Sequence, residues 1–131
     1  MRMGSPAPPG TLDAACINRA AFEYYGRLAK VKRFVDLHFT EDITLKVAAD
    51  IACLEEKYFS SFFHAKTGLR FVDFVSYVRV EHAKQLIEQH NMSISRIATD
   101  VGYHNRRSFE RAFKKWTGIT PTEFKSRVRP C

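Results

Sequence analysis

The fold is decided by residues 93–124, which read SISRIATDVGYHNRRSFERAFKKWTGITPTEF. Ser93 can cap a helix whose apolar side chains recur at steps of three and four residues. Gly102 can end that helix, because glycine adopts a positive φ without steric cost. Asn105 is a favourable N-cap for a second helix, which Gly118 can end. The stretch therefore predicts two short helices separated by a tight turn.

The same frame occurs earlier in the chain, at an offset of 50 residues. The equivalent pairs are Phe59 with Phe109, Phe63 with Phe113, Thr67 with Thr117, Gly68 with Gly118 and Phe74 with Phe124. Upstream, an offset of 49 pairs Leu45 with Ile94 and Ala49 with Ala98, so we expect the first turn to be one residue shorter. A repeat at a fixed offset indicates a duplicated supersecondary unit. The two units are expected at about residues 44–67 and 93–117.

Helical periodicity also marks the segments outside the two units. A long helix over about residues 71–89 connects them, and a capping box with proline at the first helical position begins a last helix over about 121–128. The pattern turns helical from about Asp13 to Phe39, after a stretch rich in proline and glycine that we interpret as a disordered leader over residues 1–12. Alternation typical of a strand does not persist anywhere in the sequence. The sequence predicts an all-α domain over residues 13–131.

Composition bounds the class of protein. Of the 131 residues, 45% are hydrophobic, which is enough for one packed domain, and no apolar run approaches the ~20 residues of a membrane span. The cysteines Cys16, Cys53 and Cys131 are odd in number and far apart, so we interpret each as a small buried hydrophobe or a free thiol in a reducing compartment. A cytoplasmic protein without a metal site or cofactor is expected.

The positive charge is concentrated in one part of the chain. Residues 90–131 hold nine Lys/Arg and three Asp/Glu, a net of +6, whereas residues 1–89 hold twelve and eleven, a net of +1. Such a basic end points to a polyanionic partner. Charge alone does not separate that interpretation from a merely soluble basic surface.

The second helix of each unit has an apolar face, which we expect in the core, and a polar face. The polar side chains are Lys57, Ser60, Ser61 and His64 in the first unit and Arg106, Arg107, Glu110, Arg111 and Lys114 in the second. Arginine can donate two hydrogen bonds to guanine in the major groove or pair with phosphate, and glutamate can accept from cytosine. Two arginines at a helix N-terminus gain nothing from the helix dipole, which favours anions. These faces therefore favour double-stranded DNA as the partner over plain solvated surface.

Three stretches carry a resemblance to a known family. They are RVEHAKQLI at residues 79–87, IATDVGY at 97–103 and FERAFKK at 109–115, with Gly118, Pro121 and Phe124 beyond. On these residues, the chain from about Val31 to Val128 resembles the DNA-binding domain of the AraC/XylS family of bacterial transcription regulators. The resemblance implies seven helices, two helix-turn-helix units and sequence-specific promoter binding, with activation as the expected mode and RNA polymerase as a further partner.

Carried over by position, the family's base-reading sites fall on Lys57, Ser60 and Ser61 in the first unit and on Arg106, Arg107, Glu110 and Arg111 in the second. Two residues depart from the family pattern. Cys53 stands where the first turn usually has glycine, and Glu55 stands where a serine usually caps the first recognition helix. These departures affect the expected geometry of the first unit.

The sequence also bears on other functions and on the extent of the protein. The five histidines are scattered, and no HExxH, GxSxG or P-loop pattern appears, so catalysis is not expected. A helical module that binds another protein is the alternative, and no small-molecule site is evident. The chain is either a small stand-alone regulator or the C-terminal piece of a longer one. A connecting helix of ~28 Å is nearly as long as the ~34 Å between successive major grooves, so one monomer is expected to enter both, with full entry of only one recognition helix as the alternative.

Overall fold

The computed structural model describes residues 21–22 and 25–128, and this part of the chain contains seven bounded helices and no strand. The helices are α2 (Gly26–His38), α3 (Leu45–Ile51), α4 (Glu56–Thr67), α5 (Phe71–Gln89), α6 (Ile94–Asp100), α7 (Arg106–Thr117) and α8 (Pro121–Val128). The predicted all-α class with about seven helices is confirmed. No helix in the described ranges is long and apolar enough to cross a membrane.

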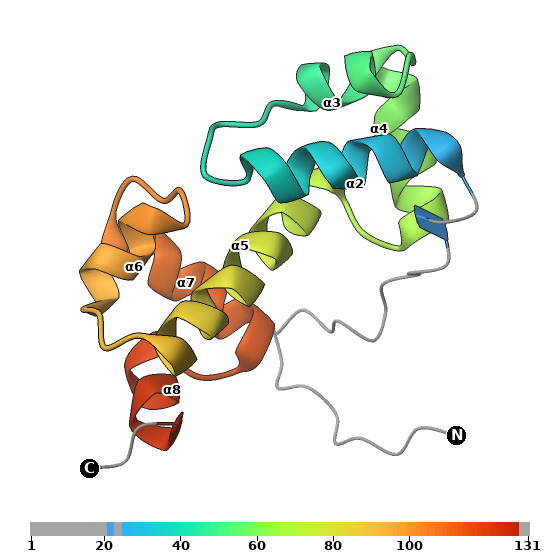
Figure 1. The fold of residues 1–131 in the computed structure, drawn as a ribbon. Helices are drawn as coiled ribbons and strands as arrows, with labels where there is room; N and C mark the ends of the chain where they lie inside the picture. The colour runs from blue at the N-terminus through green and yellow to red at the C-terminus, as the bar shows by residue number, and fades with distance from the viewer. Residues whose placement is uncertain (1–20, 23–24, 129–131) are drawn as a thin grey trace.

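Helix α5 runs through the middle of the fold and separates two groups of helices (Figure 1). On one side it packs against α2 and α4, and α3 packs on both of these helices. On the other side it packs against α6, α7 and α8, and α7 contacts both α6 and α8. The recognition helices expected from the repeat, α4 and α7, thus lie on opposite sides of the long connecting helix.

The two groups share a duplicated aromatic core. Phe59, Phe63, Phe109 and Phe113 are all fully buried. The ring centroids of Phe59 and Phe63 are 5.6 Å apart and those of Phe109 and Phe113 are 5.7 Å apart. Each second ring also contacts the phenylalanine that follows in the repeat, Phe74 at 5.7 Å or Phe124 at 5.5 Å. Equivalent residues therefore make equivalent contacts, which confirms the repeat at the level of packing.

The corner that ends each recognition helix is also duplicated. Thr67 Oγ1 donates to the carbonyl of Phe63 at 2.7 Å, and Thr117 Oγ1 donates to that of Phe113 at 2.8 Å. In both corners the hydroxyl also accepts from the backbone N–H two residues further on. The glycine that follows each threonine has φ near +85°, a conformation that glycine adopts without strain.

The predicted helix caps are present. The side chains of Thr44, Ser93 and Asn105 accept from the backbone N–H three residues later, at 3.2, 3.1 and 2.8 Å. Thr120 and Glu123 form the reciprocal capping box at the start of α8. The hydrogen bond from the Thr120 backbone N–H holds the pKa of Glu123 below its usual value.

The first turn is one residue shorter than the second, as the sequence predicts. Leu54 N–H donates to the carbonyl of Ala49 at 2.9 Å, and Tyr103 N–H donates to that of Ala98 at 3.0 Å, an offset of 49. The N-caps that follow, Glu55 and Asn105, are offset by 50. The additional residue in the second turn is therefore His104.

The two departures from the family pattern have visible consequences in the first turn. Cys53 has φ +59°, and among the described residues it is the one non-glycine with a positive φ. Its thiol is free and exposed, so the free-thiol interpretation holds for this cysteine, while the other two lie outside the described residues. Glu55 makes no side-chain cap hydrogen bond to α4. The first unit keeps the fold of the second with a less favourable turn and cap.

The helical pattern expected from about Asp13 to Phe39 is interrupted at Tyr25. Tyr25 has an extended backbone (φ −100°, ψ 111°), and α2 begins at Gly26. The carbonyl of Tyr25 accepts from the N–H groups of both Leu28 and Ala29 at 3.0 Å, so this residue acts as an N-cap and interrupts the pattern. The expected leader and most of the helical pattern expected before Tyr25 lie outside the described residues.

Candidate nucleic-acid interface

Helix α7 separates its apolar and polar side chains as the sequence predicts. Phe109, Phe113 and Trp116 face the core. Arg107, Arg111 and Lys114 are exposed on the other side of the helix. Within the described part of the chain no ion pair neutralises these three cations. They form a basic surface with a helix as its frame, which is the shape and charge that a major groove accepts.

Arg106 and Glu110 are also on this helix, but they bind each other. Arg106 Nε lies 2.8 Å from Glu110 Oε2, and Arg106 Nη1 lies 3.4 Å from the hydroxyl of Ser95 on α6. Arg106 and Glu110 are predicted from the sequence to read bases independently. In the structure their side chains form one hydrogen-bonded pair. Ser95 has no motif signal of its own, because it meets α7 only through the packing of α6 on α7.

Helix α4 carries the equivalent surface in the first unit. Lys57, Ser60, Ser61 and His64 are all exposed, on the side opposite the buried phenylalanines. At the repeat offset of 50 these four positions are equivalent to Arg107, Glu110, Arg111 and Lys114. The two faces therefore have the same helical register but different chemistry, because the first is mostly neutral and the second is strongly cationic.

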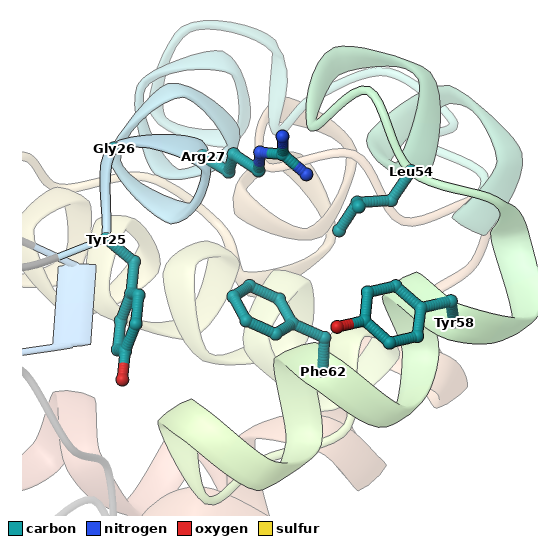
Figure 2. A pocket seen from close by; sticks show the side chains of 6 residues that line it. All are labelled: Tyr25, Gly26, Arg27, Leu54, Tyr58 and Phe62. Carbon is teal, nitrogen blue, oxygen red and sulfur yellow. The ribbon is translucent and has the colours of Figure 1, made fainter.

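Beside α4 lies a hollow of about 330 Å³ that none of its four polar residues lines. Figure 2 shows the rings of Tyr25, Phe62 and Tyr58 in a row, with Arg27 and Leu54 above them. Tyr25 and Phe62 meet edge to face at 5.7 Å. The hollow lies next to the candidate interface and is separate from it.

A groove between α5 and α7 borders the cationic face. It has a volume of about 260 Å³, and Ser108, Arg111, Ala112 and Lys115 are its lining residues on α7. Sequence reasoning missed Ser108 and Lys115, since neither shares the helical face that carries the other polar residues. Both residues lie on the flank of α7. That they border a groove becomes visible only when the position of α5 is known.

The fold and these two surfaces define a helix-turn-helix protein with two copies of the unit. A model of a helix-turn-helix domain family matches residues 48–127. The chain belongs to the AraC-type helix-turn-helix family of DNA-binding transcription regulators.

Relatives and solved structures agree with this family. The bifunctional transcriptional activator/DNA repair enzyme AdaA of Bacillus subtilis is 36% identical over 95 residues, which are 72% of this chain and 45% of AdaA. An AraC-type regulator from Chromobacterium violaceum has a similar fold, with a TM-score of 0.75 and 19% identity over 83% of this chain and 98% of that one. So does the DNA-binding domain of AdpA in complex with a target DNA, with a TM-score of 0.73 and 22% identity over 79% of this chain and 93% of that one. The chain spans less than half the length of the curated relatives that it matches.

Proposed function

We propose that this chain binds promoter DNA sequence-specifically by inserting α4 and α7 into two successive major grooves of one duplex. The observation that carries the proposal is the pair of equivalent, exposed polar faces on helices that α5 separates. A duplicated surface on a shared rod suits a ligand that itself repeats, and the major groove of B-DNA repeats every ~34 Å.

The chemistry of α7 suits direct base reading. Arg107 lies in the first turn of the helix and Arg111 lies one turn later on the same face. An arginine can donate two hydrogen bonds to O6 and N7 of guanine, which is the commonest specific contact in the major groove. The second oxygen of Glu110 stays available to accept from cytosine while the first accepts from Arg106. Lys114, further along the helix, suits a phosphate.

The face of α4 contributes differently. Ser60 and Ser61 are small and pair with several bases, so they discriminate less than arginine does. Lys57 and His64 lie on either side of the two serines. We therefore assign the stronger hold on phosphate and most of the sequence preference to the second unit, in line with the charge split of +6 against +1 along the chain.

The length of α5 sets the geometry. Its 19 residues span ~28 Å at ~1.5 Å per residue, slightly less than the ~34 Å between successive major grooves. DNA that bends toward the protein would let both helices enter fully, at a cost of a few kcal/mol that the second set of contacts offsets. The proposed site is asymmetric and about 20 base pairs long, and a single chain reads it.

Two finer assignments belong to the same proposal. The matching region of AdaA comes from a protein described as a transcriptional activator, and activation is the mode we propose here, with RNA polymerase as the further partner. A regulator of promoters works where the chromosome is, so the proposed location is the cytoplasm of a bacterium.

Selection of binding sites from random duplex DNA, followed by titration over a salt series, tests the proposal. We expect one enriched asymmetric motif, and an affinity that falls steeply with salt because bound phosphates release counterions. The double variant Arg107→Ala/Arg111→Ala should lose preference for the motif. Arg33→Ala, which removes an exposed arginine from α2, is the matched control and should keep it. No enriched motif, or binding that salt does not affect, would favour a protein-interaction module instead.

A further inference from the structure

Helix α5 holds a loop of the first unit through two side chains one turn apart. Arg79 Nε donates to the carbonyl of Phe39 at 2.7 Å, and Arg79 Nη2 donates to the carbonyl of Glu41 at 2.8 Å. The ring of His82 stacks on the ring of Phe39, with centroids 4.0 Å apart and an angle of 14° between the planes. This loop joins α2 to α3, so its position fixes where the first helix-turn-helix unit begins.

The same arginine contacts the turn of the second unit. The guanidinium carbon of Arg79 lies 5.1 Å from the centre of the Tyr103 ring, within the range of a cation–π contact. The Tyr103 hydroxyl lies 3.4 Å from the hydroxyl of Ser76, one turn before Arg79 on α5. Tyr103 belongs to the turn that leads into α7. One guanidinium thus lies between the loop before α3 and the turn before α7.

The loop and the turn also touch each other directly. A side chain at Gly102 would place its Cβ 2.9 Å from the carbonyl oxygen of Phe39 and 2.9 Å from Cα of Thr40, closer than real Cβ atoms approach. At the outer edge, His104 Nε2 lies 3.3 Å from a carboxylate oxygen of Asp42. His104 is the residue by which the second turn exceeds the first, and it meets the other unit at this junction.

We propose that Arg79 is a positioning residue that sets the spacing and rotation between the two recognition helices, and hence the spacing between the two halves of the DNA site. This inference rests on the proposed function for its DNA part alone. Arg79 is partly buried and directs its donors to carbonyls of its own chain, so it acts through the two turns and not by reading bases. The planar guanidinium group of arginine has donors in fixed directions, so its two hydrogen bonds hold the loop in one orientation. The ammonium group of lysine rotates freely and does not impose one orientation.

The first test needs no DNA. Spin labels at Glu56 and Lys115, both exposed and one on each recognition helix, report the distance between α4 and α7 by pulsed electron resonance, after replacement of the native cysteines. We expect a narrow distance distribution in the parent chain and a broader or displaced one in Arg79→Lys, which keeps the charge and loses the fork. Arg70→Lys, at the N-cap of α5, is the matched control and should leave the distribution narrow. Arg79→Gln, whose amide can replace one of the two hydrogen bonds, takes its place if Arg79→Lys does not fold.

The second test measures how DNA affinity depends on the spacing between the half-sites. The selected site is lengthened in single steps up to about five base pairs, which turns one half-site by about half a helical turn. The parent chain should bind the natural spacing best, and Arg79→Lys should lose about fivefold or more there while it gains tolerance of other spacings. Its affinity for an isolated second half-site should stay that of the parent.

The outcomes separate the two proposals. The role of Arg79 is overturned if the distance distribution in Arg79→Lys has the same width and the same centre as in the parent. This holds whatever the DNA results are. A parent chain that shows no preferred spacing overturns binding through two grooves, while a broadened distribution in Arg79→Lys still supports the junction.

Discussion

In the proposed binding mode, base reading depends most on Arg107 and Arg111, because the other arginine of the face is paired with Glu110. Replacing either with alanine should weaken binding to the selected site by about 1–3 kcal/mol for each base that the arginine reads. The free energy of unfolding should change by less than about 0.5 kcal/mol, since both side chains are exposed. Titrations at one fixed salt concentration and urea denaturation measure the two quantities. If both variants bind the selected site as tightly as the parent does, the face that reads bases lies elsewhere.

Cys53 and Gly102 occupy equivalent positions in the two turns. Substitutions at these two positions should change the free energy of unfolding in opposite directions. Cys53 has φ +59°, so Cys53→Gly should raise the free energy of unfolding by up to about 1 kcal/mol. Gly102 has φ +104° and no room for a Cβ, so Gly102→Ala should lower it by more than that. Urea denaturation of both variants is the measurement. A destabilised Cys53→Gly would mean that the cysteine side chain supports the turn by interactions that outweigh its backbone conformation.

At the scale of the helices, the duplicated phenylalanines predict matched losses of stability. Phe63→Ala and Phe113→Ala each remove a fully buried ring beneath a recognition helix, and each should cost roughly 3–5 kcal/mol in the free energy of unfolding. Tyr58→Ala is the control and should cost much less, because Tyr58 on α4 is 57% exposed. Denaturation curves give all three values. An unchanged midpoint for Phe113→Ala would contradict the repeat.

Much of the helical structure could be predicted from the sequence, because the repeat indicates which phenylalanines are buried and which glycines end helices. The interruption at Tyr25 could not, since its apolar spacing continues across the break and only the backbone hydrogen bonds reveal it. Nor could the binding of Arg79 to a loop about 40 residues away, because periodicity reports the face of a helix and not its distant partner. The pairing of Arg106 with Glu110 could have been predicted from the sequence, since side chains four residues apart on a helix are neighbours.

At the scale of the whole molecule, the proposed function requires one rigid chain that spans two turns of a duplex. In the proposed binding mode, the junction around Arg79 fixes the two units on α5, and the second unit, where the positive charge is concentrated, is expected to be the stronger anchor. Weakening of the first unit should therefore shorten the protected region of DNA before it abolishes binding. The proposed asymmetry would distinguish the chain from a regulator that reads two equal half-sites as a dimer.

Footprinting of the selected site, at protein concentrations where the chain is monomeric by sedimentation, tests binding through two grooves most directly. Major-groove methylation protection reports each groove separately. We expect two protected tracts centred about one helical turn apart on the same face of the duplex, with stronger protection at the tract that α7 reads. A single short tract, or a palindromic site that is occupied only by two chains, would contradict this mode of binding.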